Sequence, residues 1–261
     1  MKNLRYAITT GRSRVPGLLE KAQAWGAALE APVIIRQRNQ RLEALLEQQN
    51  LEALVVATAG GPQVITAQGK FTYHPSMAVL RLQQLKENKV DYLVEALGLR
   101  LGLKVLDCTL GLAADAAIAS YVVGSEGRVV GLEASRLLHF LVSQGLRTYV
   151  AEDKDLALAM KRITALNIRA EDYLPTVAVD QYDVIYFDPM FRKPVQGSSG
   201  MDGMRPFTYE EPLSLEAVKL AAKLAQRVVI KERSEEILAS YGCREFVGGK
   251  YSRIKYGIIR R

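Results

Sequence analysis

The residues with the clearest potential for chemistry lie at the end of an apolar run. Residues 182–187 are largely apolar, and Asp188, Pro189 and the aromatic Phe191 follow them. Pro189 cannot continue a strand, so Asp188 is expected at the carboxyl end, where ligands bind in open α/β sheets. Asp188 and the Pro189 carbonyl could accept hydrogens from an amine while Phe191 stacks on the ring that carries it. The alternatives are that Asp188 caps the following turn and that Phe191 packs in the core.

Further acids follow other predicted strands. Asp107 ends a short apolar run and precedes a turn of small residues, which would bring backbone N–H groups and a helix start close to a ligand. Glu133 stands about 20 residues beyond that turn, where an acid can bind two ribose hydroxyls. Glu171 and Asp172 follow a third run, where an acid can bind an adenine amino group. Each acid alone could be a solvated residue at a helix start, but together they favour an adenosine-containing cofactor.

Two such cofactors remain open on these residues. A nicotinamide dinucleotide needs spaced glycines for its pyrophosphate, whereas the turn has Gly111 alone, with Ala113 where a second glycine is expected. S-adenosylmethionine has no phosphate, and its positive sulfonium and amino groups would be attracted by carboxylates such as Asp107. The acids at the strand ends therefore favour S-adenosylmethionine.

Composition limits the class of protein. The 261 residues are 49% hydrophobic and 24% charged, which is ordinary for a soluble globular chain. We see no apolar run of the roughly 20 residues that a membrane helix needs, and no secretory signal. The two cysteines and two histidines form no metal-ligand cluster. We therefore expect a cytoplasmic protein with no membrane span and no structural metal.

The charge is positive and uneven. Lys and Arg number 35 against 28 Asp and Glu, which gives +7, and the excess lies near the two ends of the chain. Such a bias fits contact with a polyanion, although a solvated basic surface explains it equally well.

The elements that must position these residues fall into two α/β parts joined by a helical connection. We expect a small N-terminal module at 1–75 and the connection at 76–103, with Ser76 as a helix N-cap. The module's strands are expected at 4–10, 33–35 and 53–58, with 62–66 a candidate fourth, and its helices at 17–29 and 39–49.

From residue 104 to 261, strands and helices alternate with short connections. This order implies a parallel sheet with helices on both faces, closed by an antiparallel hairpin at 244–247 and 253–259. The other strands are expected at 104–108, 128–132, 166–169, 182–188 and 227–231, and the helices at 112–123, 134–144, 153–163 and 214–225.

The segment from Asp107 to Asp115, Glu133 and the Asp-Pro-Met-Phe run at 188–191 together resemble the class I S-adenosylmethionine methyltransferases. More narrowly, they resemble the RsmJ-type family of bacterial ribosomal RNA methyltransferases, which modify the 2-amino group of a guanine in small-subunit rRNA. The resemblance covers roughly residues 90–259 and implies a Rossmann-like class I methyltransferase sheet. The family commonly has glycine where Ala113 stands and arginine at Ala114 and Ala134, and a pair of serines replaces Glu171 and Asp172.

The motifs and the resemblance together define the candidate site. The catalytic candidates are Asp188, Pro189 and Phe191. Cofactor contacts are predicted at Asp107, Thr109, Gly111, Ala114, Asp115, Glu133, Ala134, Glu171, Asp172 and Asp188. Substrate contacts are predicted at Phe191, Arg192, Lys193, Arg205 and Lys231, of which Arg192 to Arg205 bound a glycine- and serine-rich segment that could bind RNA phosphates or be a plain connection.

The leading functional hypothesis is an RNA guanine-N2 methyltransferase that acts on ribosomal RNA or the small ribosomal subunit. An amino methyltransferase that acts on adenine or cytosine in RNA or DNA would use the same residues, Asp188, Pro189 and Phe191, so the sequence does not separate the two. A non-catalytic RNA-binding relative and a small-molecule methyltransferase are the remaining alternatives.

Overall fold

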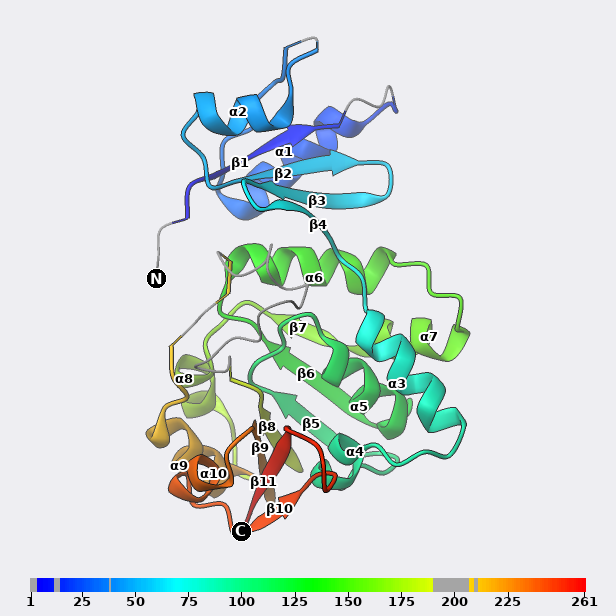
Figure 1. The fold of residues 1–261 in the computed structure, drawn as a ribbon, viewed down its shortest axis with the longest axis vertical. Helices are drawn as coiled ribbons and strands as arrows, with labels where there is room; N and C mark the ends of the chain where they lie inside the picture. The colour runs from blue at the N-terminus through cyan, green and yellow to red at the C-terminus, as the bar shows by residue number, and fades with distance from the viewer. Residues whose placement is uncertain (1–3, 12–14, 38, 190–206, 209–210) are drawn as a thin grey trace. The chain divides into compact units, whose positions relative to one another are not determined.

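The computed structural model describes residues 4–11, 15–37, 39–189, 207–208 and 211–261, and they divide into two compact units (Figure 1). The first unit contains the described residues up to His74, the segment Ser135–Thr148 and the described residues of Pro194–Tyr209. The second contains Pro75–Ala134 and the described residues of Tyr149–Lys193 and Glu210–Arg261. Each unit has a sheet of its own.

The first unit is built on a sheet with the order β1-β2-β3-β4, in which β1 and β2 are parallel and the other neighbours antiparallel. Its central strand β2 is apolar from Ala53 to Ala57 and buried along that length, as a strand covered on both faces must be. The strands are β1 (Tyr6–Thr10), β2 (Ala53–Thr58), β3 (Gly61–Thr66) and β4 (Gly69–Thr72), and the helices are α1 (Leu18–Leu29), α2 (Leu42–Gln48) and α6 (Arg136–Thr148). Trp25 on α1 and Phe140 on α6 form a T-shaped aromatic pair, with ring centroids 5.4 Å apart.

Two sequence expectations for this unit are wrong. Residues 33–35 form a single parallel bridge, between Ile8 and Val33, instead of a strand. Ile8 bonds to the Pro32 oxygen and to the Ile34 N–H, each at 2.8 Å, and the next residue, Ile35, is already 76% exposed. The expected strands also omit β4, which begins at Gly69.

The segment 76–103 contains two helices, α3 (Ser76–Lys86) and α4 (Tyr92–Leu97), rather than one continuous helical stretch. Ser76 was expected to be the N-cap of α3, but Pro75 holds that position and Ser76 is the first helical residue. Asp91 caps α4 by accepting hydrogen bonds from the backbone N–H groups of Leu93 and Val94.

Within the described residues, the second unit holds a seven-stranded sheet with the order β10-β11-β9-β8-β5-β6-β7. Strands β5 to β9 are mutually parallel, and β11 pairs antiparallel with β9 and with β10. The expected α/β Rossmann-like sheet, mostly parallel with a closing antiparallel hairpin, is therefore confirmed. Its strands are β5 (Lys104–Asp107), β6 (Arg128–Leu132), β7 (Thr164–Leu166), β8 (Val184–Phe187), β9 (Arg227–Glu232), β10 (Glu245–Val247) and β11 (Lys255–Arg260).

Helices pack on this sheet in two groups. Helices α3, α5 and α7 pack against one another, while α8, α9 and the 3-10 helix η1 pack together over a buried apolar cluster that includes Leu106, Val130 and Val228 (Figure 1). The bounds are α5 (Ala114–Val123), α7 (Lys154–Arg162), α8 (Ala170–Tyr173), η1 (Leu174–Thr176), α9 (Leu215–Leu224) and α10 (Glu235–Ser240).

The strand predicted at 166–169 lies at Thr164–Leu166 in the structure. Strand β7 ends at Leu166, because the side chain of the next residue, Asn167, turns to donate to the carbonyl oxygens of Glu133, at 2.7 Å, and Ala134, at 3.3 Å. Asn167, Ile168 and Arg169 then lead to the short helix α8.

Candidate active site

Two acids lie at the carboxyl edge of the sheet, on either side of its topological switch point. Strand β5 lies between β6 and β8, so the chain moves outward from β5 in one direction and later returns to its other side. Asp107 ends β5 and pairs in register with Tyr186 of β8, two residues before Asp188. In open α/β sheets this is the position where ligands bind.

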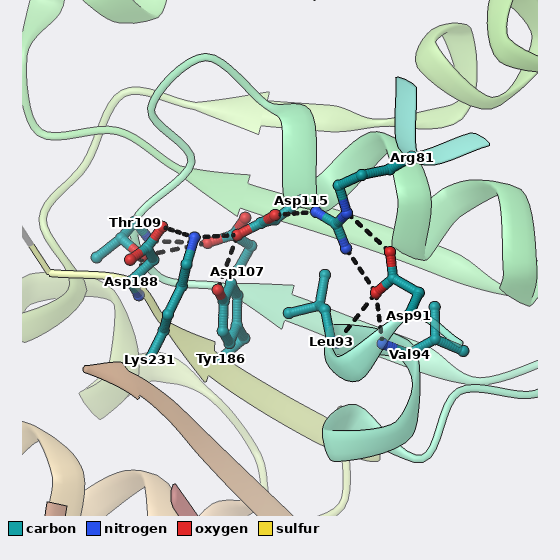
Figure 2. Close-up of polar contacts among 10 residues, drawn as sticks. All are labelled: Arg81, Asp91, Leu93, Val94, Asp107, Thr109, Asp115, Tyr186, Asp188 and Lys231. Atoms are coloured by element: carbon teal, nitrogen blue, oxygen red, sulfur yellow. Dashed lines mark hydrogen bonds and ion pairs between the residues drawn. The ribbon is translucent and has the colours of Figure 1, made fainter. Parts of the chain in front are cut away.

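Thr109 joins these two acids. Its hydroxyl oxygen accepts a hydrogen bond of 2.6 Å from the backbone N–H of Asp188, and its own backbone N–H donates to Asp107 Oδ1 at 3.0 Å (Figure 2). The Thr109 side chain therefore links the turn after β5 to Asp188, the residue that follows β8.

Asp107 is the most deeply buried of these acids, with 2% of its surface exposed. Burial raises the pKa of Asp107 to about 8, although the hydrogen bond from the Thr109 backbone opposes that rise. The carboxyl is therefore mostly neutral at pH 7, and a cation brought close to it would favour the ionised form.

Lys231, near the end of β9, binds two acids at once. Its Nζ lies 2.7 Å from Asp188 Oδ2 and 3.1 Å from Asp115 Oδ2. Burial disfavours the ammonium form, but the two carboxylates outweigh burial and raise the pKa of Lys231, so it stays charged. Burial raises the pKa of Asp188 to about 6 against the lowering effect of Lys231, which leaves Asp188 mainly ionised at neutral pH.

Asp115, in the first turn of α5, is enclosed by donors. Tyr186 Oη donates to its Oδ2 at 2.8 Å, and the Arg81 guanidinium binds its Oδ1 (Figure 2). Burial disfavours the charged form of Asp115, but Lys231 and Arg81 hold the pKa of this carboxyl below its ordinary value. The carboxylate that the sequence assigned to the cofactor therefore binds three protein groups in this structure.

The sequence reading missed Arg81, Asp91 and Tyr186. Asp91 accepts two hydrogen bonds of 2.8 Å from Arg81, through Nε and one terminal nitrogen, and so fixes the guanidinium against Asp115. Arg81 lies on α3, 34 residues before Asp115, and no local motif connects them. Tyr186 stands in an apolar run that predicts only core packing, and its hydroxyl role has no sequence signal.

Glu133 and the turn before α5 also lie at this edge. Glu133 Oε2 accepts a 3.1 Å hydrogen bond from the Gly111 N–H, while the backbone N–H of Glu133 bonds to the Leu166 oxygen at 2.9 Å. Ala113 has φ of 60°, in the left-handed region that favours glycine, and Ala114 begins α5. The predicted contacts Gly111 and Glu133 are thus brought together, and Ala134 follows directly in the chain.

The structure describes some of the remaining predicted contact residues, and the others lie outside the described residues. Glu171 and Asp172 lie in the first turn of α8, where Glu171 Oε2 is 3.5 Å from Arg169 Nε. Pro189 follows Asp188 and is partly buried. Phe191, Arg192, Lys193 and Arg205 lie outside the described residues. Their assignments stay predictions.

The ion pairs give this edge a definite charge. Arg81 and Lys231 alternate with Asp91, Asp115 and Asp188, so the chain of five begins and ends with a carboxylate and carries one net negative charge. A cationic ligand such as a sulfonium with an amino group fits an edge of this charge. Among the described residues, no cluster of His, Cys, Asp and Glu has the arrangement of a metal site, and no helix is long and apolar enough to span a membrane.

Comparison with known proteins agrees with this chemistry. A family model described as "Putative SAM-dependent methyltransferase" matches residues 30–254. The chain is 33% identical over 224 residues to a Bacillus subtilis (strain 168) protein named "Uncharacterized protein YpiP", a match that covers 85% of this chain and 86% of that one.

Two further relatives are named "Ribosomal RNA small subunit methyltransferase J". That of Cellvibrio japonicus (strain Ueda107) is 32% identical over 161 residues, which is 55% of this chain and 57% of the relative. That of Rhodopseudomonas palustris (strain HaA2) is 40% identical over 101 residues, 38% of this chain and 43% of the relative. Each match thus spans less than two thirds of the relative. Among solved structures, TrmN from Thermus thermophilus aligns with 99% of this chain and 72% of its own, at 17% identity and a TM-score of 0.44.

Proposed function

Since the chain belongs to the family of S-adenosylmethionine-dependent methyltransferases, we propose that its methyl acceptor is the exocyclic amine of a nucleobase, namely N2 of a guanine in small-subunit ribosomal RNA. The observation that carries this proposal is the position of Asp188. It follows β8 at the switch point, its N–H is fixed by Thr109, and Pro189 is the next residue in the chain. The relatives named as rRNA methyltransferases support the choice of RNA.

The cofactor supplies a methyl group on a positively charged sulfur and a neutral sulfide as the leaving group. The residues that would hold it are Asp107, beside the switch point, and Glu133 with the Gly111 backbone. The fit rests on charge, because this edge carries a net negative charge and holds in Asp107 a carboxyl that can ionise when a cation approaches.

Asp188 acts on the acceptor amine. The lone pair of an exocyclic amine is delocalised into the ring, so the nitrogen must be aligned and its lone pair localised before it can attack. The Asp188 carboxylate and the Pro189 carbonyl can accept the two amine hydrogens and hold the nitrogen in that form. One of these protons can leave to Asp188 Oδ after the methyl group has moved, so a strong base is not needed.

The substrate must present its amine away from a base pair. The N2 of a paired guanine is engaged with its partner, so an unpaired or flipped-out base is expected. The net charge of +7 favours association with such a polyanion, and the cytoplasm is where rRNA would be met.

Mapping of rRNA modifications by mass spectrometry tests this proposal. Small-subunit rRNA from cells that lack the protein should have lost one N2-methylguanosine, and wild-type protein should restore it. Asp188→Asn, which keeps the side-chain shape but not the charge, should fail to restore it. Unchanged rRNA in the deletion strain would contradict the rRNA substrate, and a lost methyladenosine or methylcytidine would correct the base.

Calorimetric titration of the purified protein with S-adenosylmethionine accompanies this test. Wild type should bind the cofactor, and measurable binding by Asp188→Asn would show that this variant is folded and that its defect lies in transfer. Failure of wild type to bind would contradict the enzymatic proposal and favour a non-catalytic relative.

A further inference from the structure

The turn between β10 and β11 lies at the same edge of the sheet as Asp188. Strand β11 runs antiparallel to β9, with Lys255 paired to Glu232 and Tyr256 paired to Lys231. The beginning of β11 is therefore at the carboxyl end of β9, and residues 248–254, which lead into it, lie at that edge (Figure 1). The turn adjoins the strand residues that carry the site.

The turn presents an aromatic ring and two cations to solvent. Tyr251 is 90% exposed, which is unusual for so large a ring. The ammonium of Lys250 lies over this ring, 5.6 Å from its centroid, and Arg253 is exposed two residues further on. Among the described residues, neither Lys250 nor Arg253 pairs with a carboxylate. Lys250, Tyr251 and Arg253 are thus all exposed to solvent.

The turn that carries them is nevertheless fixed. Ser252 N–H donates to the Gly249 oxygen at 3.0 Å, and Ile254 N–H donates to Ser252 Oγ at 3.1 Å. A Cβ at Gly249 would come within 3.2 Å of the Tyr92 ring, so the backbone of the turn packs on the first residue of α4. Tyr92 follows Asp91, the residue that holds Arg81 in the site.

We propose that this turn is a second contact for the RNA substrate, in which Tyr251 stacks on an unpaired base while Lys250 and Arg253 bind the flanking phosphates. The inference rests on the proposed function in that it takes the substrate to be RNA. A ring on which any base can stack, flanked by cations that bind no carboxylate among the described residues, is the combination that binds single-stranded nucleic acid. The position at the edge would place this contact beside the base that Asp188 receives.

Fluorescence anisotropy with the full chain and a labelled single-stranded RNA oligonucleotide of mixed sequence tests the stacking contact. Tyr251→Ala should raise the Kd about 5- to 150-fold, the range for loss of one base–aromatic stack. Tyr251→Phe keeps the ring and should stay within about twofold of wild type. Cofactor binding should be the same in all three proteins, because Tyr251 lies outside the cofactor residues.

Salt dependence tests the phosphate contacts. The double variant Lys250→Ser/Arg253→Ser should make the negative slope of log K against log salt shallower by about 1.4, or 0.7 for each single-strand phosphate. The matched control is Arg100→Ser/Lys104→Ser, which removes two exposed cations at and before the start of β5, the opposite edge of the sheet. Its slope should equal that of wild type.

Each failure has its own reading. Wild-type affinity in Tyr251→Ala, together with normal rRNA methylation, would overturn the turn contact and leave the proposed function intact. Equal losses in both double variants would show a general charge effect and also overturn it. A wild-type protein that binds cofactor but no RNA would overturn the rRNA substrate and this contact together. Normal RNA binding by Tyr251→Ala with lost methylation in cells would assign the ring to a protein partner instead.

Discussion

Lys231 Nζ lies 2.7 Å from Asp188 Oδ2, so the acid proposed to hold the substrate amine has a cation at hydrogen-bonding distance. The same nitrogen lies 3.1 Å from Asp115, which is held in turn by Arg81. The charge of Asp188 therefore depends on side chains from β9, α5 and α3. This dependence can be measured by removing the cations one at a time.

Replacing Lys231 by methionine should raise the pKa of Asp188. Burial raises the pKa of Asp188 to about 6 and Lys231 opposes the rise, so without Lys231 the pKa should lie higher still. Rates of methyl transfer measured against pH should then fall off at a higher pH on the acid side than in wild type. The unfolding free energy should drop by about 1–3 kcal/mol, because two carboxylates lose a partner.

Lys231→Arg serves as the control for this variant. It keeps a cation beside Asp188, so the acid limb of its pH profile should stay near that of wild type. An identical limb in Lys231→Met would show that Lys231 does not set the ionisation of Asp188.

Replacing Arg81 by methionine should cost more stability. The side chains of Arg81, Asp91 and Asp115 are 15%, 9% and 14% exposed, so the loss of the guanidinium leaves two poorly solvated carboxylates. We expect a loss of about 3 kcal/mol near neutral pH, measured by urea unfolding. The pKa of Asp115 is lowered in the folded protein, so its stabilising effect is present above the ordinary carboxyl pKa and is lost as the pH falls. The difference between wild type and Arg81→Met should therefore shrink toward pH 3.

Lys86→Met provides a matched control on the same helix. Lys86 also binds two acids, Asp153 and Asp155, but these three side chains are 35–54% exposed. Its removal should lower the unfolding free energy by clearly less than the removal of Arg81, because water screens exposed ion pairs. Equal costs for the two variants would contradict the role given to burial around Arg81.

Asp107→Asn should stabilise the protein while weakening cofactor binding. The pKa of Asp107 rises from an ordinary 3.8 to about 8 on burial, so folding takes up a proton between these values and stability falls as the pH rises. Asparagine keeps an acceptor for the Thr109 N–H but has no charge to desolvate. The variant's advantage should grow from pH 5 to pH 8 and reach at least about 1.4 kcal/mol, the equivalent of one tenfold change in ionisation.

Urea unfolding at the two pH values measures this effect, and calorimetry measures the cofactor affinity. Asp183→Asn is the control, because it makes the same substitution outside the site. Asp183 directly precedes β8, and its carboxylate accepts a hydrogen bond from the Lys104 N–H. A constant difference between Asp107→Asn and wild type across this pH range would contradict the assignment.

The parts of the fold that the sequence predicted are those where local composition decides the structure. The expected bounds of β2 and β6 agree with the structure, because each is an apolar run closed by polar or turn-forming residues. The positions of Asp107, Glu133 and Asp188 at strand ends were predicted for the same reason, since a polar residue that closes a buried apolar run must lie at the end of the strand. The prediction of β7 failed because the side chain of Asn167 competes for backbone hydrogen-bond partners, which hydrophobic patterning does not show.

The relationships within the site needed the structure. Asp115 and Lys231 were chosen from motifs as separate cofactor and substrate contacts, yet they bind each other across 116 residues of sequence. The position of Arg81 depends on how α3 packs against α5, and the Tyr186 hydroxyl is hidden in an apolar run. Such contacts depend on tertiary packing, which composition and periodicity do not determine.

The turn before α5 depends on a glycine in the neighbouring strand. A Cβ at Gly131 of β6 would lie 2.4 Å from Leu110 Cδ1, and Leu110 N–H bonds to the Leu132 oxygen at 2.8 Å. Gly131→Ala should therefore displace Leu110 and lower the unfolding free energy by about 1–3 kcal/mol. Cofactor affinity should also fall, because Gly111 follows Leu110 in the displaced turn.

A double-mutant cycle with Leu110→Ala isolates this contact. Trimming Leu110 removes the atoms that the new methyl group meets, so Gly131→Ala should cost less in the Leu110→Ala background than in wild type. Gly60→Ala, where the new Cβ would lie 4.0 Å from Thr58 Oγ1, should cost little and serves as the control for glycine replacement. Additive costs in the cycle would show that the turn does not rest on the close approach of Leu110 to β6.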